Sequence, residues 1–222
     1  MKILGITGSP RGEKSGAMHL IRAVLNGTRD KEADVEVINL VEYDLRFKNA
    51  CSICFQEGDC VYEDDFPKRY RKIRSADGIV LGSPVYFDLA TRQMKMLIDR
   101  MADDIQCQSL TGKYGCAIST SGDHAEGTVV TYLNHFLQML GATPVGGVGG
   151  ATGRDGTALV SAESEAHKLG RTLADAISTE RKYPKIDQFH QRFQEKFRAV
   201  ISDTMSKWPR DYDLWVDQTW VW

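Results

Sequence analysis

The alternation of strand-like and helix-like segments over the first 180 residues constrains the fold of this chain most strongly. Apolar segments of strand length occupy residues 2–7, 35–40, 77–83, 114–119 and 143–145. Apolar residues recur at helical spacing in the segments that follow them, over residues 16–25, 65–73, 89–101, 127–140 and 161–180. Such alternation predicts right-handed crossovers and a parallel sheet covered by helices on both faces. The expected fold class is therefore α/β, a three-layer sandwich around a five-stranded parallel sheet.

Charge and cysteine content narrow the class of protein. The chain has 222 residues, and its 28 Lys and Arg against 30 Asp and Glu give a formal net charge of −2. This balance argues against nucleic acid or an anionic membrane as a partner. No segment approaches the ~18 consecutive apolar residues of a spanning helix, and residues 1–5 do not resemble a signal peptide. The five cysteines, an odd number, are a poor basis for a disulfide framework, so we expect a cytoplasmic protein.

The loop after the first strand has the composition of an anion site. It reads Gly8-Ser9-Pro10-Arg11-Gly12-Glu13-Lys14-Ser15-Gly16 and leads into a helix. Small residues let the backbone approach an anion, hydroxyls and amides donate to it, and the helix N-terminus is positive. The loop matches neither the Walker A spacing nor G-x-G-x-x-G. We predict a phosphate monoester held by hydroxyls, amides and Arg11, with an ordinary glycine-rich turn as the alternative.

The loops after the third and fourth strands end at the same edge of the predicted sheet, where such folds bind ligands. The first, Gly82-Ser83-Pro84-Val85-Tyr86-Phe87, suits a flat aromatic ligand, unless its aromatic side chains merely cap the core. The second, Ser119-Thr120-Ser121-Gly122-Asp123-His124, offers small donors for the polar edge of a heterocycle. Two roles stay open for His124, a proton donor or a bystander. Arg154, in the glycine-rich segment after the fifth strand, belongs either to a flexible rim or to a phosphate site for a second substrate.

Together these motifs resemble the flavodoxin-like NADPH-dependent FMN reductase family. The resemblance covers about residues 1–180 and rests on three segments: Gly8-Ser9-Pro10-Arg11, Gly82-Ser83-Pro84-Val85-Tyr86-Phe87, and Met94-Lys95 with Asp99-Arg100. The cysteine-bearing loop and the Asp64-Asp65 pair are most similar to the iron–sulfur flavoprotein branch. The resemblance implies a flavodoxin-like fold with strand order 2-1-3-4-5 and bound FMN.

The same resemblance implies which residues bind the cofactor. Those of the first loop would hold the FMN phosphate, namely Ser9, Pro10, Arg11, Ser15, Gly16 and Ala17. Those of the later loops would flank the isoalloxazine ring (Pro84, Val85, Tyr86 and Phe87) and contact its pyrimidine side (Ser121, Gly122 and Asp123). The family usually has Asn at the position of Ser15 and Thr or Ser at that of Gly16. A hydroxyl remains, so we expect weakened but persisting phosphate binding.

The cysteine loop departs furthest from the branch it resembles. That branch has Cys-x2-Cys-x2-Cys and a fourth cysteine a few residues on, whereas this chain has only Cys51, Cys54 and Cys60. A four-iron cluster normally needs four thiolates, and no nearby histidine completes a zinc site. We therefore expect no iron–sulfur cluster and no metal. The loop is interpreted as a redox-inert relic that shapes the rim above the flavin.

The expected function is electron transfer from NAD(P)H through bound FMN to a flavin, quinone or protein acceptor. In such enzymes the cofactor carries the chemistry, and no catalytic side chain is assigned. Two alternatives remain: an electron carrier without NAD(P)H activity, and a non-catalytic flavodoxin-like scaffold.

Residues 181–222 form a C-terminal extension to the flavodoxin-like domain of residues 1–180. Apolar residues at helical spacing predict a helix from Ile186 to Lys207, which Trp208-Pro209 ends. All four tryptophans lie in the last fifteen residues, Trp208, Trp215, Trp220 and Trp222. Since tryptophan is enriched at interfaces, we expect a homodimer or higher homo-oligomer with this tail packed across the neighbouring subunit.

Overall fold

The computed structural model of the chain describes residues 1–58, 60–151, 157–218 and 220. The predicted Arg154 and the tail residue Trp222 lie outside the described residues. Within those ranges, no helix has both the length and the apolar character that crossing a membrane requires.

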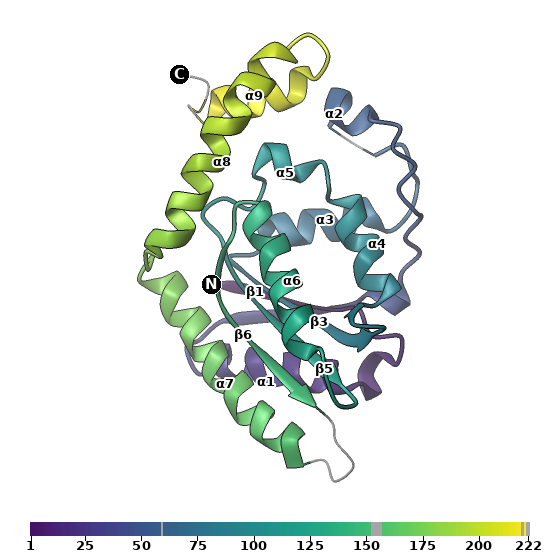
Figure 1. Ribbon diagram of the computed structural model, residues 1–222, viewed down its shortest axis with the longest axis vertical. Helices are drawn as coiled ribbons and strands as arrows, with labels where there is room; N and C mark the ends of the chain where they lie inside the picture. The colour runs from purple at the N-terminus through teal and green to yellow at the C-terminus, as the bar shows by residue number, and fades with distance from the viewer. Residues whose placement is uncertain (59, 152–156, 219, 221–222) are drawn as a thin grey trace.

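A parallel sheet forms the centre of the molecule (Figure 1). Its parallel strands are β1 (Lys2–Thr7), β2 (Asp34–Asn39), β3 (Gly78–Tyr86), β5 (Tyr114–Ser121) and β6 (Thr143–Ala151), in the order β2-β1-β3-β5-β6. This order confirms the predicted 2-1-3-4-5, counted over the parallel strands. The sequence did not predict β4 (Leu89–Ala90), a short strand antiparallel to the end of β3, nor that β6 continues through its glycines.

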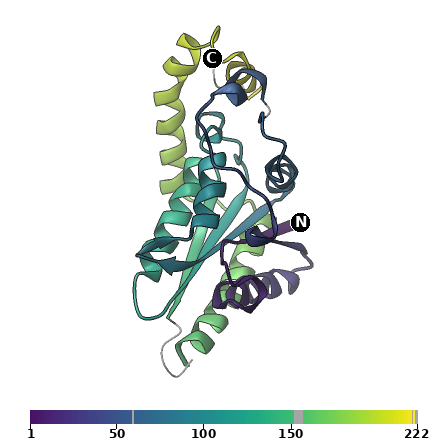
Figure 2. The same cartoon turned by 90° about the vertical axis from the view of Figure 1, so that its right-hand side faces the viewer.

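Helices cover the two faces of the sheet, as expected. The helices are α1 (Gly16–Arg29), α2 (Ile53–Glu57), α3 (Phe66–Ser75), α4 (Arg92–Arg100), α5 (Asp104–Cys107), α6 (Glu126–Met139), α7 (Thr157–Ser178), α8 (Pro184–Asp203) and α9 (Pro209–Asp217). Helices α1 and α7 bury one face of the sheet, and α3, α4 and α6 bury the other (Figure 2). Successive residues of β1 divide between the faces, because Ile3 packs under α1 and Leu4 under α3 and α4.

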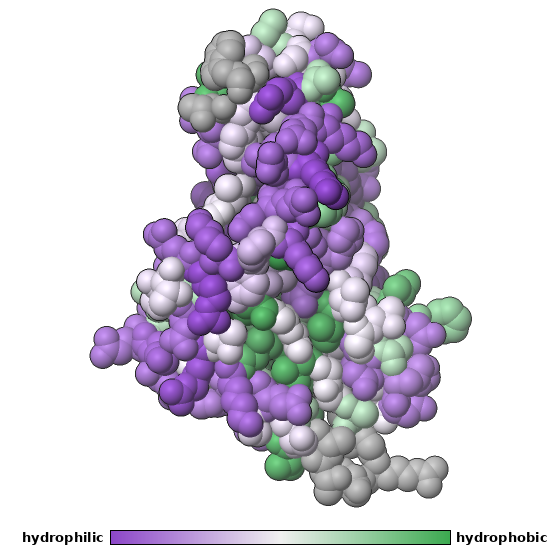
Figure 3. Space-filling view, turned by 60° about the vertical axis from the view of Figure 1, so that its left-hand side comes forward, coloured by the Kyte–Doolittle hydropathy of each residue, from purple (hydrophilic) through white to green (hydrophobic). Residues whose placement is uncertain are grey.

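The C-terminal extension folds back onto its own chain. Helix α8 runs along one side of the molecule with a predominantly hydrophilic outer face (Figures 1 and 3). The sequence did not predict helix α9. Pro209 starts it, since the missing amide and fixed φ of proline suit a first helical position. Trp215 is completely buried beside α5, and its indole Nε1 donates to the carbonyl of Gln106 at 2.8 Å. Trp208 stacks on Phe55 of α2 with 5.0 Å between ring centroids.

These contacts differ from the expected packing of the tail across a neighbouring subunit. They account for Trp208 and Trp215 within one chain. The homo-oligomer and the boundary at residue 180 remain predictions.

Helices α1 and α7 cross in close backbone contact at two glycines. A Cβ on Gly27 would overlap the carbonyl oxygen of His167, and a Cβ on Gly170 would overlap that of Val24. Neither neighbour is the end of a flexible side chain, so the backbones themselves would have to separate.

We expect Gly170→Ala to lower the free energy of unfolding by about 2–3 kcal/mol, a typical cost of overpacking. Urea denaturation followed by circular dichroism measures the change. The matched control is Gly127→Ala on α6, where a Cβ would meet nothing within 4 Å. A helical glycine in open space gains stability, or loses none, on becoming alanine. Equal stabilities for the two variants would contradict the close contact.

Candidate flavin site and the cysteine cavity

A hydrogen-bonded frame holds together the carboxyl ends of three strands. The amide of Gly8 donates to the carbonyl of Gly82 at 2.9 Å, which ties β1 to β3. The Thr91 hydroxyl donates to the carbonyl of Gly8, and the Thr91 amide donates to the Ser83 hydroxyl at 3.0 Å. From β5, the Ser119 hydroxyl donates to the carbonyl of Ser83 at 2.9 Å. Because Thr91 also caps α4, the frame fixes the start of that helix relative to the sheet.

The loop after β1 forms an anion cradle at the start of α1. Ser15 is the N-cap: its hydroxyl accepts from the Met18 amide at 3.1 Å and donates to the carbonyl of Gly12 at 2.8 Å. Helix geometry leaves the amides of Gly16 and Ala17 without intrahelical carbonyl partners, so they are available to an anion.

The structure brings the predicted phosphate-binding residues together. Ser9 and Ser15 are buried in the cradle, while Pro10 and Arg11 lie exposed at its rim. A Cβ on Gly16 would lie 3.4 Å from the Thr120 side chain, so β5 forms the wall opposite α1. The prediction omitted Thr120, although it belongs to the donor-rich segment at the end of β5.

An exposed hairpin follows the end of β3 and carries the predicted aromatic residues. Phe87 and Asp88 form its two-residue turn, both with positive φ (50° and 62°). The Phe87 side chain is fully exposed and that of Tyr86 half-exposed. These two aromatic side chains therefore do not cap the core, and the alternative that they serve only as core packing is excluded. Val85 packs against the core, and Pro84 pairs in register with Thr120.

The loop after β5 lies next to this hairpin. His124 bridges the two, with Nε2 at 3.1 Å from the carboxylate of Asp88 and Nδ1 against that of Asp123. The neighbouring carboxylates, first Asp123 and then Asp88, raise the pKa of His124. Ser121 donates to the carboxylate of Glu126 at 2.7 Å. His124 thus links the hairpin to the loop after β5 through its contacts with Asp88 and Asp123.

These three loops fit the FMN that the resemblance implies. The cradle offers buried hydroxyls and open amides for a phosphate, and Gly16 itself places no side chain in the space between α1 and Thr120. The hairpin offers exposed aromatic surface for a planar ring. Donor chemistry and shape therefore agree at one edge of the sheet.

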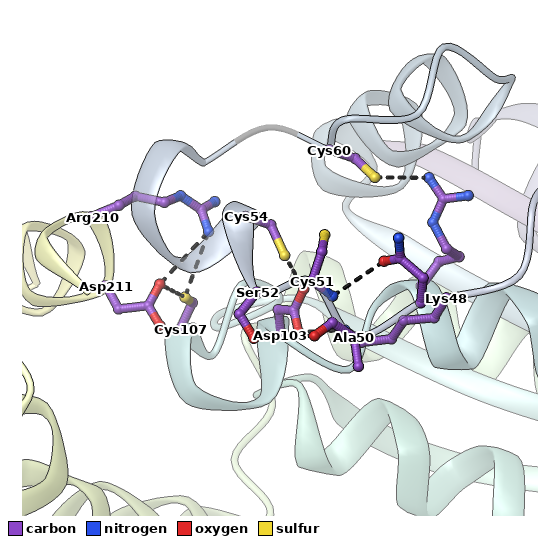
Figure 4. A network of polar contacts seen from close by, with 12 residues as sticks. Lys48, Ala50, Cys51, Ser52, Cys54, Cys60, Asp103, Cys107, Arg210 and Asp211 are labelled. Atoms are coloured by element: carbon purple, nitrogen blue, oxygen red, sulfur yellow. Dashed lines mark hydrogen bonds and ion pairs between the residues drawn. The ribbon is translucent and has the colours of Figure 1, made fainter. Parts of the chain in front are cut away.

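The three cysteines of the 51–60 loop lie elsewhere, around a cavity of about 490 Å³. The thiol of Cys54 contacts the carboxylate of Asp103, which also forms an ion pair with Lys48 (Figure 4). Burial, and then the hydrogen bond and charge of Asp103, raise the pKa of Cys54 to about 12. The Cys60 thiol accepts from the Arg100 guanidinium at 3.2 Å.

The position of this cavity corrects the interpretation of the loop as a rim above the flavin. Helix α4 follows its N-cap Thr91, in the strand-end frame, and ends at Arg100, beside the cysteines. Its nine residues span roughly 14 Å, so the cavity and the flavin site lie at opposite ends of the helix. Figure 1 shows α2 and α9 at the end of the molecule away from the carboxyl ends of β5 and β6.

The cysteine residues do not fit a four-iron cluster. Cys51 and Cys54 are three residues apart, and a further cysteine at the same spacing would stand at position 48. That position is Lys48, whose ammonium cannot ligate iron. Cys107 and Cys116 are buried in α5 and β5. Across the described ranges, no three His, Cys, Asp or Glu side chains are placed to hold a metal ion.

A buried ion pair anchors the loop. The Arg100 guanidinium forms an ion pair with Asp64, and the two side chains are 3% and 0% exposed. The same carboxylate accepts from the amides of Arg46 at 2.9 Å and Phe66 at 3.0 Å. Burial alone would raise the pKa of Asp64, but these hydrogen bonds and the Arg100 charge outweigh it and lower the pKa.

Comparison with known proteins agrees with this geometry. The sequence model for "NADPH-dependent FMN reductase" matches residues 1–155. The chain is 29% identical over 225 aligned positions to an iron–sulfur flavoprotein of Archaeoglobus fulgidus, and the match covers 100% of both chains. This match therefore includes the C-terminal extension, whereas the resemblance drawn from the sequence motifs covers only about residues 1–180.

Two solved structures show the same fold. RosB with a bound intermediate, 8-demethyl-8-formylriboflavin-5'-phosphate, has a TM-score of 0.67 at 16% identity, covering 88% of this chain and 87% of its own. A flavodoxin from the domain Archaea has a TM-score of 0.53 at 18% identity, covering 80% and 99%. The predicted flavodoxin-like fold is confirmed.

We expect Asp64→Asn to cost about 3–5 kcal/mol of stability at neutral pH, because it leaves the buried Arg100 charge unpaired. Denaturant unfolding of both proteins between pH 7 and pH 3 measures the cost. A lowered folded-state pKa stabilises the protein above the unfolded value of about 3.9, and this contribution is lost as the pH falls through the folded value. The difference between wild type and variant should therefore be constant down to about pH 5 and shrink below pH 4. A control, Asp99→Asn, removes an exposed carboxylate paired with Lys95 on the same helix and should change little.

Proposed function

Because this chain belongs to the NADPH-dependent FMN reductase family, we propose that it binds FMN at the strand-end site and transfers electrons from NAD(P)H to a small-molecule or protein acceptor. A free flavin or a quinone is the acceptor class we favour. One observation carries the proposal: a cradle of buried hydroxyls and open amides lies beside an exposed aromatic hairpin. This is the pairing that a ring with a phosphate tail requires.

Each loop would contribute one part of the binding. Ser9 and the amides of Gly16 and Ala17 would donate to the phosphate, with Arg11 supplying charge from the rim. Ser15, whose hydroxyl donates to Gly12, would hold the cradle in shape. Pro84 to Phe87 would flank the ring, and Ser121 to Asp123 would contact its pyrimidine side. When bound, FMN supplies hydride and single-electron chemistry. The chain's own residues would orient the ring beside the exposed Tyr86 and Phe87 side chains.

A second candidate is an electron carrier without NAD(P)H activity. The full-length similarity to an iron–sulfur flavoprotein favours it. Anaerobic mixing of the flavin-loaded protein with NADPH, and then with NADH, separates the two. Rapid loss of flavin absorbance with either nucleotide supports the reductase; reduction by dithionite alone supports the carrier. A colourless protein that does not bind added FMN would contradict both.

For the phosphate cradle, we expect Arg11→Gln to weaken FMN binding roughly tenfold, the effect of losing one charge-assisted contact. Quenching of flavin fluorescence during titration of the apoprotein measures Kd. The matched control is Arg29→Gln, an exposed arginine in the last turn of α1, the helix that follows the cradle; this variant should bind FMN as wild type does. An unchanged Kd for Arg11→Gln would place the phosphate elsewhere.

A further inference from the structure

The cavity beside the cysteines has the lining of a ligand site that the flavin chemistry does not use. It opens between α2, α3, α5 and α9, and its volume of about 490 Å³ lies within the usual range for small-molecule sites. Aromatic and thiol groups form much of its wall, including Tyr62, Phe66 and Tyr70. Such a wall suits a largely apolar ligand with a few polar groups.

Positive charge is concentrated on the same wall. Among the described residues that line the cavity, five are cationic, Lys48, Arg71, Arg74, Arg100 and Arg210, and two are carboxylates, Asp103 and Asp104. Asp103 is occupied by Lys48 and Cys54, and Asp104 by the Tyr70 hydroxyl. Asp64 neutralises Arg100, and Arg210 is 3.7 Å from Asp211.

Two arginines on α3 line the cavity without a direct ion pair, although the buried Asp104 carboxylate, which the Tyr70 hydroxyl contacts, lies within electrostatic range of Arg74. Neither Arg71 nor Arg74 forms an ion pair with any residue that the structure describes, and both are exposed at the mouth of the cavity. Arg74 lies near the Tyr70 ring, with 5.8 Å between its guanidinium carbon and the ring centroid. A ligand that reaches this mouth therefore meets two unpaired guanidinium groups next to an aromatic surface.

The C-terminal helix closes the cavity on the opposite side. Arg210 of α9 lines it and packs closely against Gly58, where φ is +85°. The next residue, Asp211, accepts from the buried thiol of Cys107 at 3.0 Å. These contacts hold the wall formed by Arg210 in place before a ligand binds, which reduces the entropy cost of binding.

We propose that this cavity is a second binding site, and that it takes a small aromatic molecule carrying a carboxylate or phosphate. The ring lies among Tyr62, Phe66 and Tyr70, and the anionic group pairs with Arg71 and Arg74. The chemistry of recognition is bidentate guanidinium binding of a planar or tetrahedral anion beside an apolar surface.

Phenyl phosphate is a suitable probe, with benzyl alcohol as its uncharged counterpart and inorganic phosphate as the anion without a ring. Isothermal titration of the full-length, FMN-loaded protein should show phenyl phosphate binding at least tenfold more tightly than either. Benzoate should behave like phenyl phosphate. Equal binding of benzyl alcohol, or of inorganic phosphate, would overturn the proposal.

The double variant Arg71→Gln/Arg74→Gln tests the position of the anion. It should lower the affinity for phenyl phosphate at least tenfold and leave the affinity for FMN unchanged, because the flavin site lies at the other end of α4. Lys68→Gln, an exposed cation on the same helix that does not line the cavity, is the matched control and should bind phenyl phosphate normally. Unchanged binding by the double variant would overturn the proposal, as would stoichiometric iron and sulfide in anaerobically purified protein.

The FMN titration distinguishes binding of phenyl phosphate in the cavity from binding at the flavin site. Loss of phenyl phosphate binding with normal FMN binding supports the second site alone. If phenyl phosphate binds only when FMN is absent, it occupies the flavin phosphate cradle and the second site is refuted.

Discussion

The buried ion pair between Arg100 and Asp64 is the contact on which the arrangement around α4 depends. Neither charge reaches solvent, so each must be satisfied by the other and by nearby groups. Asp64 also accepts the amides of Arg46 and Phe66, and Arg100 donates to the carbonyl of Arg46 at 3.0 Å. One pair therefore joins the loop after β2, the start of α3 and the end of α4.

Helix α4 links the two sites through its ends. Thr91 at its first turn belongs to the strand-end frame, and Arg100 at its last turn holds Asp64 and Cys60. A helix of nine residues is too short to be stable alone, so tertiary contacts at both ends must order it. Removing either end contact is expected to loosen the helix as a unit, whereas changes at the cavity mouth leave it in place.

How much of this could be predicted from sequence depends on whether the signal is local. Strand and helix periods lie within short segments, so the layers could be anticipated, as could the cradle from Gly8 to Gly16. The strand order was instead implied by the family resemblance. Thr91 also had a local signal, a threonine directly before a helical pattern, which we did not use. The walls of the cysteine cavity had none, because Lys48, Asp103 and Arg210 come from segments far apart in the chain.

The tryptophan-rich end illustrates the same limit. Tryptophan at a chain end predicts burial but not the surface that buries it, and we assigned that surface to a second subunit. In the structure, the surface that buries the tryptophans belongs to the same chain. It is formed by α2 and α5, which have five and four residues, too few to bury their own apolar sides. Trp208 and Trp215 complete their packing, which explains why α9 returns across the molecule.

A net charge of −2 describes neither site of this molecule. The formal count averages the exposed carboxylates of the helices with the arginines of α3, α4 and α9. Recognition depends instead on the charges that share a wall and on which of them are already paired. At the cysteine cavity Asp64 pairs with Arg100 and Asp103 with Lys48, so the unpaired charges that a ligand meets among the described residues are positive. The near-neutral composition argues against a polyanionic partner, which needs an extended basic surface, but it carries no information about a small anion, for which two guanidinium groups suffice.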